Sequence, residues 1–90
     1  MGPVDDLRRK HRRILEAVFT DPVPASIRWD DIEALFLALG ATITEGSGSR
    51  VHVEMGERLA AFHRPHPQKE TDRGAVRSVR RFLENAGVEP

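Results

Sequence analysis

The chain has 90 residues, no cysteine, and 14 basic side chains balanced by 14 acidic ones. A chain of this length is expected to form one domain with a small core, and the lack of cysteine excludes disulfides and thiolate zinc sites. No apolar run approaches the roughly 20 residues of a membrane span, so we expect a cytoplasmic protein with no membrane partner.

The charges are distributed unevenly along the chain. Residues 14–57 contain eight acids and two arginines, whereas residues 58–81 contain seven basic residues and two acids. A second basic block occupies residues 8–13. Arginine supplies 12 of the 14 basic side chains, and its planar guanidinium can donate two parallel hydrogen bonds to a phosphate. This pattern favours phosphate binding, although solvated helix faces paired with nearby acids are the alternative.

Residues 4–19 are expected to form an amphipathic helix that precedes the main body of the domain. Arginines occupy one side, and the other side carries, at 3-4 spacing, Leu7, His11, Ile14, Leu15 and Val18. Two aspartates, Asp5 and Asp6, suit the positive end of the helix dipole. We therefore divide the single domain, residues 1–90, into an N-terminal helix with its linker, residues 1–25, and a core, residues 26–90.

A second helix is expected to begin at Trp29, after a short extended link, and to stop at Gly40. Its buried stripe is Ile32, Leu35, Phe36 and Leu39. A tryptophan beside a helix start usually covers the core. We therefore interpret Trp29 as structural, with base stacking as the alternative.

A β-hairpin is predicted by the alternation of apolar and polar residues between Arg50 and His63. Gly56-Glu57 has glycine at the first central position of a two-residue turn, as a type II′ turn requires. This turn sets the register, which pairs Met55 with Arg58, Val53 with Ala60, Val51 with Phe62, His52 with Ala61, and Arg50 with His63. One face is then apolar and packs on helices, whereas the other exposes Arg50, His52, Glu54 and His63.

The segments on either side of the hairpin complete the predicted fold. A first strand spans residues 41–45, and the loop Gly46-Ser47-Gly48-Ser49 follows it, either as a flexible connection or as a backbone cradle for phosphate. After a basic loop, residues 63–69, Asp72 can cap a third helix over residues 73–86. The core stripe of this helix is Val76, Val79, Leu83 and Ala86, with Phe82 beside it. We therefore expect an α+β fold of order α-β-β-β-α, with the helices on one face of a three-stranded antiparallel sheet and an extra N-terminal helix.

Residues 27–88 resemble the HicA (YcfA-like) toxin family. The matching features, in order, are Leu39-Gly40 at a helix end, the loop residues Gly46, Gly48 and Ser49, the step Pro65-His66, and the helix end Ala86-Gly87. The resemblance implies a fold like that of double-stranded-RNA-binding domains. It also implies a toxin of a type II toxin-antitoxin system that cleaves messenger RNA as an mRNA interferase and is neutralised by a HicB-type antitoxin protein.

The chain departs from the family pattern at one position. The family's essential histidine follows the Gly-Ser step on the second strand, and Arg50 stands there in this chain. Arginine cannot act as a general base at neutral pH. Ser49 and His66 match the family's serine and its Pro-His histidine, whereas His52 matches no essential position.

Metal-independent RNA cleavage needs a base for the 2′-hydroxyl, an acid for the leaving oxygen, and positive charge near the phosphate. We predict His52 and His63 as catalytic candidates, with Arg50 holding the phosphate and Glu54 orienting His52. The predicted RNA-binding residues are Gly48, Ser49, Arg50, Arg64, His66, Lys69, Arg73 and Arg77. The alternatives are an inactive RNA-binding domain of the same fold and a protein-interaction module. We expect no cofactor, no metal site at His52, His63, His66 and Glu54, and a monomer in preference to an oligomer.

Overall fold

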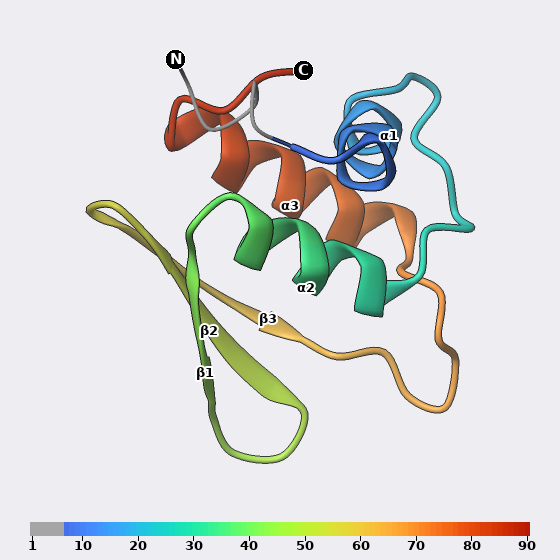
Figure 1. Cartoon of the computed structure of the whole chain (residues 1–90). Coiled ribbons are helices and arrows are strands. Elements are labelled where there is room, and N and C mark those ends of the chain that lie inside the picture. Colours follow the sequence, from blue (N-terminus) through green and yellow to red (C-terminus); the bar gives the residue numbers. More distant parts are fainter. Residues whose placement is uncertain (1–6) are drawn as a thin grey trace.

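The computed structural model describes residues 7–90 (Figure 1). Within this range the elements are α1 (Arg9–Val18), α2 (Trp29–Ala38), β1 (Thr42–Glu45), β2 (Arg50–Met55), β3 (Arg58–His63) and α3 (Arg73–Asn85). The order is the predicted α-β-β-β-α with an extra N-terminal helix, so the predicted α+β fold is confirmed. In this part of the chain no helix is long and apolar enough to cross a membrane.

The sheet is antiparallel in the order β1-β2-β3, so β2 is central and β3 is an edge strand. The predicted hairpin register is confirmed at all five pairs, from Met55 opposite Arg58 to Arg50 opposite His63. Gly56 has a φ of +60°, a backbone conformation that side-chain-bearing residues rarely adopt. The turn can therefore close in two residues, and this fixes which side chains share a face.

The molecule has three layers. Helices α2 and α3 cover one face of the sheet, and α1 lies on the far side of this helical layer from the sheet (Figure 1). Val51 and Val53 of the central strand are completely buried beneath the helices. Each such side chain contributes about 1.5–3 kcal/mol relative to an exposed one, which makes this face of the sheet the centre of the core.

Four aromatic rings join the helices to the sheet. Phe62 of β3 lies 5.7 Å from Trp29, 5.8 Å from Phe36 and 6.0 Å from Phe82, measured between ring centroids. Trp29 is only 3% exposed. A ring so covered offers no platform to a base, and the structural interpretation of Trp29 is confirmed.

The ends of the helices follow the predicted capping residues, with small differences in position. Asp72 accepts a 2.8 Å hydrogen bond at Oδ1 from the backbone N–H of Ala75, so the predicted cap of α3 is confirmed. The helix ends at Asn85, one residue before the prediction, and Gly87 follows with a φ of +80°. Ala86 is half-buried, because it belongs to the terminal turn and not to the buried stripe.

Two other predicted boundaries also shift. Helix α1 begins at Arg9 and ends at Val18, so it is shorter than the predicted span of residues 4–19; Asp5 and Asp6 lie outside the described residues. Strand β1 begins at Thr42, because Ala41 still bonds back to Phe36 of α2 through its N–H.

The link before α2 pairs with the loop before α3. Thr71 donates a 2.7 Å backbone hydrogen bond to Ile27, and Trp29 donates one of 3.0 Å to Lys69. These bonds attach the loop between β3 and α3 to the start of α2. The loop that carries the Pro-His step is therefore held by these bonds at its C-terminal end, just before α3.

Candidate ribonuclease site on the open face of the sheet

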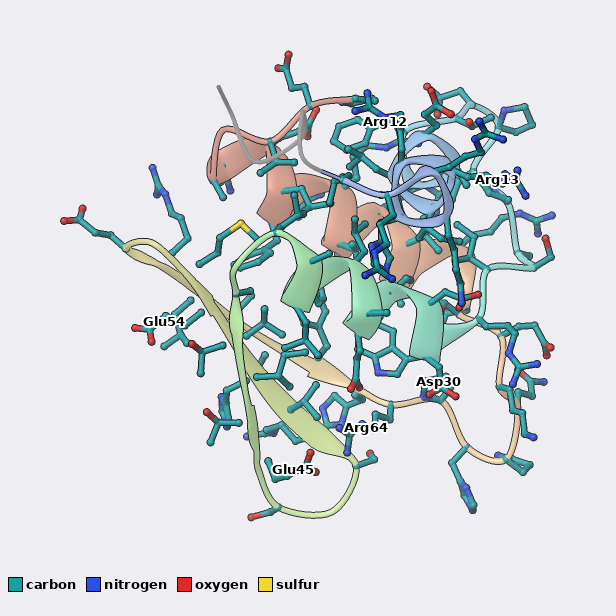
Figure 2. All side chains as sticks on the ribbon, in the orientation of Figure 1. Arg12, Arg13, Asp30, Glu45, Glu54 and Arg64 are labelled. Carbon is teal, nitrogen blue, oxygen red and sulfur yellow. The ribbon has the colours of Figure 1, made fainter. Side chains whose placement is uncertain are left out.

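The face of the sheet opposite the helices carries the predicted polar cluster. Arg50, His52 and Glu54 alternate with the buried valines of β2, and Figure 2 shows Glu54 pointing away from the helical layer. Arg50 lies directly opposite His63 of β3, and both side chains are exposed. The structure therefore brings three predicted catalytic candidates onto one open surface.

The imidazole of His52 leans toward the loop that follows β1. Its Nε2 atom lies 3.1 Å from the position that a Cβ atom would occupy on Gly46. Gly46 is held opposite Arg50 by a 2.8 Å hydrogen bond from its N–H to the Arg50 carbonyl. The His52 ring, Arg50 and His63 thus follow one another across the sheet, with Arg50 in the middle.

The predicted orienting role of Glu54 has no support in this arrangement. Glu54 and His52 share a face as i and i+2 of one strand, but in residues 7–90 no hydrogen bond or ion pair joins them. The His52 ring is half-buried and lies toward Gly46. Glycine at position 46 leaves the space that this ring position needs.

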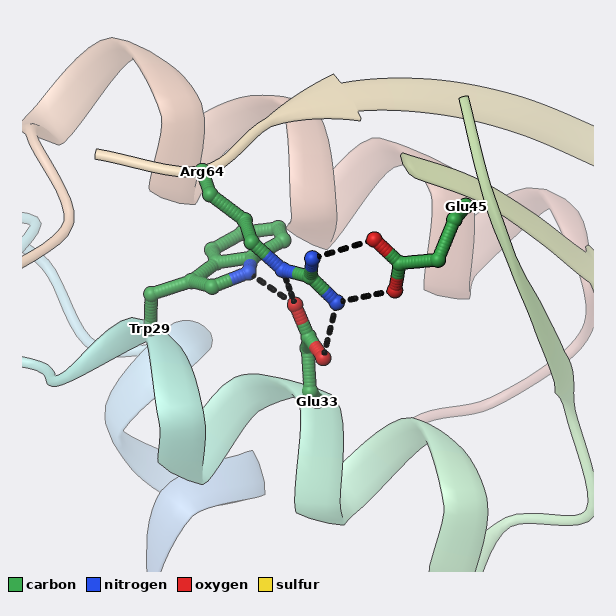
Figure 3. Close-up of polar contacts among 4 residues, drawn as sticks. All are labelled: Trp29, Glu33, Glu45 and Arg64. Carbon is green, nitrogen blue, oxygen red and sulfur yellow. Dashed lines mark hydrogen bonds and ion pairs between the residues drawn. The ribbon is translucent and has the colours of Figure 1, made fainter. Parts of the chain in front are cut away.

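Next to this face, the end of β3 carries an ion-pair cluster formed by Arg64, Glu33 and Glu45 (Figure 3). Arg64 donates to Glu33 of α2 from Nε at 2.7 Å and from Nη2 at 3.2 Å. It donates to Glu45 of β1 from Nη1 at 2.6 Å and from Nη2 at 2.7 Å. The indole N–H of Trp29 donates to the same Glu33 oxygen as Arg64 Nε. The Arg64 guanidinium therefore connects α2 and β1 to the residue that directly follows β3.

The electrostatics of this cluster follow from its geometry. Hydrogen bonds from Arg64 hold the pKa of Glu45 below its ordinary value. Hydrogen bonds to Glu33 and then to Glu45 raise the pKa of Arg64 above its already high value. Two carboxylates face one guanidinium, so the cluster as a whole carries negative charge. An incoming phosphate would therefore compete with two carboxylates for the Arg64 guanidinium.

The cluster also fixes the glycine-serine loop. The backbone N–H of Arg64 donates a 2.9 Å hydrogen bond to the carbonyl of Ser49, which continues the β2–β3 ladder one pair beyond the strands. Glu45 ends β1 on the other side of this loop. The loop of residues 46–49 is thus held at both ends by contacts of the same arginine.

Comparison with known families now adds to this geometry. Residues 29–88 match the family model described as the HicA toxin of bacterial toxin-antitoxin systems. The protein belongs to the HicA toxin family. No curated protein and no solved structure matches the chain. The resemblance seen in the sequence is confirmed, and the family implies a toxin of a toxin-antitoxin system with an antitoxin partner.

In this HicA-family protein, the predicted RNA-binding residues lie in different surroundings. Arg64 is engaged by two carboxylates, and Arg73 donates from Nε to the carbonyl of Val23 at 3.0 Å. Arg77 is exposed on α3, and within residues 7–90 it has no ion pair or hydrogen bond through its side chain. Gly48 and Ser49 are exposed in the loop after β1. The RNA-binding roles of these residues stay predictions.

His66 and Lys69 lie together at the start of α2. They line a shallow hollow of about 280 Å³, with Trp29, Asp30 and Arg64 among the other lining residues. Both side chains are exposed. The hollow is separate from the open face of the sheet, so the site predicted from the sequence divides into two neighbouring surfaces. In the described part of the chain, no group of three or more histidine, aspartate or glutamate side chains is placed to hold a metal ion.

Sequence reasoning missed the roles of Glu33 and Glu45. The strand alternation contained part of the signal, because Glu45 shares the helix-facing side of β1 with Ile43. A carboxylate on the helix-facing side of a strand is placed to meet a basic residue at the edge of the helical layer. That partner, Arg64, lies 19 residues further along the chain, beyond the reach of any local pattern.

Proposed function

We propose that this toxin is a metal-independent endoribonuclease that acts on messenger RNA through the open face of its sheet. The observation that carries the proposal is the row formed by the His52 ring, Arg50 and His63 across the sheet. It places a permanent positive charge between two imidazoles, the side chains that most often serve as general acid and base in catalysis. Messenger RNA as the substrate implies that the toxin works in the cytoplasm.

In the proposed reaction one histidine takes the proton of a ribose 2′-hydroxyl, and the oxygen attacks the adjacent phosphorus. The bond from phosphorus to the 5′-oxygen breaks, and the other histidine gives that oxygen its proton. The products are a cyclic phosphate and a free 5′-hydroxyl, so no co-reactant is needed. Arg50 neutralises the charge that builds on the phosphate oxygens.

The spacing on the sheet suits this chemistry. Directly opposite residues have Cβ atoms about 4.5–5.5 Å apart, so Arg50 and His63 can contact the same phosphate. His52 is a diagonal neighbour of His63, with Cα atoms roughly 7–8 Å apart, and its ring lies on the side away from β3, toward Gly46. This separation allows the two imidazoles to approach a phosphodiester from different sides.

Binding of the substrate beyond the reacting phosphate is assigned to the loop beside this face, to the neighbouring hollow at the start of α2, and to an exposed arginine of α3. The exposed loop at Gly48 and Ser49 borders the row, and Lys69, His66 and Arg77 lie further along the chain. RNA recognition of this kind depends on shape and on phosphate contacts. It should therefore weaken steeply as salt is added.

The test is incubation of the purified toxin with a long unstructured RNA in EDTA. The wild type is compared with His52→Ala, His63→Ala and Arg50→Ala, and His11→Ala on α1 serves as the matched control because it is remote from the sheet. Cleavage that disappears in a sheet histidine variant and persists in the control supports the proposal. Equal cleavage by all the variants removes the row from the mechanism.

A second candidate function is RNA binding without cleavage. It is favoured by Arg50 at the position where the family pattern has its histidine, because a guanidinium cannot serve as a base. The same experiment separates the two functions: salt-sensitive binding with no product supports the inactive domain. If the wild type neither binds nor cleaves RNA, the remaining interpretation is that this surface contacts a protein partner.

A further inference from the structure

The outer edge of β3 displays unpaired backbone groups. Met55 and Arg58 flank the two-residue turn and exchange hydrogen bonds, so alternate residues of β3 bond to β2 up to the contact between Arg64 and Ser49. The intervening residues Leu59 and Ala61, and His63 after them, direct their N–H and C=O groups away from the sheet. Among residues 7–90 these groups have no hydrogen-bond partner.

The middle of this edge, residues 59–62, lacks the usual protection against strand pairing. Natural edge strands are kept short or carry charged residues, prolines or bulges. Strand β1, the other edge, has four residues, whereas β3 has six and reads Leu-Ala-Ala at residues 59–61. Leu59 is 68% exposed, and it is the more exposed of the two large hydrophobic residues, Leu37 and Leu59, that face solvent in the described chain. An open apolar edge of this length is a surface for a partner strand.

A cleft runs beside the same edge, between β3 and α3. One section has a volume of about 500 Å³ and includes Leu59, Ala60, Phe82 and Asn85 in its lining. A second section, of about 260 Å³, includes Ala61 and His63 and shares Ser78 with the first. The side chains of an added strand that point toward the helical layer would enter this cleft.

The charge of the cleft limits what can occupy it. Arg58 of β3 and Arg81 of α3 both line the larger section, at the end near the hairpin turn. Both are exposed, and in the described chain neither has an ion-pair partner. Glu57 is the acidic residue of this section, so the two arginines outnumber it at this end of the cleft, whereas Asp72 lines the smaller section. An incoming strand with a carboxylate at this end would gain an ion pair.

We propose that an extended segment of the antitoxin adds to the edge of β3 as a fourth strand, antiparallel to β3. Its apolar residues enter the cleft beside Phe82, and an acidic residue near its C-terminal end reaches Arg58 and Arg81. Main-chain hydrogen bonds to residues 59, 61 and 63 supply affinity, and the cleft supplies specificity. The proposal rests on family membership and the open edge, and it does not depend on RNA cleavage.

A second copy of the toxin is a less suitable occupant. If two β3 edges paired antiparallel about Ala61, Leu59 of one copy would face His63 of the other, and Arg58 would face Arg64. The arginines of the cleft would then gain no carboxylate from the opposing strand, which contains no acid. A strand from a different protein, with a carboxylate opposite Arg58, meets the charge at this end of the cleft better.

The experiment is a titration of the isotopically labelled full chain with a synthetic peptide, followed by backbone amide NMR. The probe is acetylated and amidated and has the sequence Thr-Val-Thr-Val-Thr-Glu; the matched control peptide ends in Lys. Binding at the edge should slow hydrogen exchange at the amides of Leu59, Ala61 and His63 at least tenfold. The lysine peptide should bind at least tenfold more weakly.

Three variants make the assignment specific. Ala61→Pro removes an outward N–H without removing a bond to β2, and edge strands tolerate such a proline. Arg81→Glu reverses a charge of the cleft and remains informative if the proline variant fails to fold. Arg77→Glu is the matched control, on the same helix but outside the cleft. We expect at least tenfold weaker binding in the first two and unchanged binding in the third.

Several outcomes would overturn the proposal. Equal binding of the peptide to wild type and Arg81→Glu would remove the cleft as its site, as would shifts that map to another surface. Absence of wild-type binding at about 1 mM peptide would show that the edge does not accept such a strand. If hydrogen exchange at the same three amides slows when only the protein concentration is raised, a second copy of the toxin occupies the edge.

Discussion

Arg80 of α3 donates a 2.8 Å hydrogen bond from Nε to the carbonyl of Val18, the last residue of α1. Its Nη2 atom donates to the carbonyl of Thr20 at 2.9 Å, and the guanidinium lies 5.8 Å from the centre of the Phe19 ring. Helix α1 precedes the segment that matches the family. One arginine of the family fold therefore holds the C-terminal end of the additional helix.

Replacing this arginine should loosen α1. We expect Arg80→Ala to lower the free energy of unfolding by about 1–2 kcal/mol, because hydrogen bonds from a charged donor contribute about 1.5–3 kcal/mol and this one is partly exposed. Urea unfolding followed by circular dichroism measures the change. Arg77→Ala, three residues away and exposed, should cost less than about 0.5 kcal/mol. Equal losses in the two variants would show that the Arg80 contacts do not hold the helix.

The cluster of Arg64 and Glu45 predicts a loss of stability in acid. The pKa of Glu45 is lowered in the folded state by the hydrogen bond from Arg64, relative to its ordinary value of 4.5. A carboxylate of this kind stabilises the fold above its unfolded pKa and loses that contribution as the pH falls through its folded pKa. The free energy of unfolding should therefore decrease as the pH drops below about 4.5.

The measurement is the urea midpoint between about pH 7 and about pH 3, compared with that of Glu45→Gln. Glu45 has an exposed side chain, so solvent screens the interaction and the effect should be small. The glutamine variant should lose less stability over the same acid range. An identical pH dependence in the two proteins would contradict a stabilising role for this pair.

Gly46 is predicted to control the position of the His52 ring. A Cβ atom at this position would lie 3.1 Å from His52 Nε2 and 3.2 Å from the Arg50 carbonyl oxygen. Gly46→Ala should therefore displace the imidazole while the buried core stays intact. We expect RNA cleavage to fall at least tenfold, with a loss of stability of about 1–3 kcal/mol.

Activity and the ring signals of His52 in NMR should change together in this variant. Ser47→Ala, in the same loop, is the matched control and should leave both unchanged. Full activity in Gly46→Ala with a displaced His52 ring would exclude this histidine from the reaction. Full activity with an undisturbed ring would show that the loop adapts to the added methyl group.

The parts of the fold that were predictable from the sequence depend on local rules. The hairpin register follows from a two-residue turn and strict alternation, so the face shared by Arg50, His52 and His63 could be predicted correctly from the order of the residues. The ring position of His52 over Gly46 was not predictable, because it depends on how closely β1 and β2 approach.

The arginine roles were the least predictable, because one residue type serves two purposes in this chain. Arg64 and Glu33 are 31 residues apart, and Arg80 and Val18 are 62 apart. Neither separation belongs to a helix or strand period, so the charge pattern favoured phosphate binding without separating Arg64 and Arg73 from an exposed arginine such as Arg77. The structure instead divides them into arginines that join elements and arginines that face solvent.

This division predicts different salt dependences of RNA binding. A phosphate contact to single-stranded RNA contributes roughly −0.7 to the slope of log affinity against log salt. Arg77 faces solvent and, in the described residues, has no ion-pair partner, so Arg77→Gln should reduce the slope by about this amount. Arg80 is occupied by Val18, Thr20 and Asp21, so Arg80→Gln should lower stability but leave the slope unchanged. Fluorescence anisotropy at several salt concentrations measures both, and a reduced slope for Arg80→Gln alone would reverse the assignment.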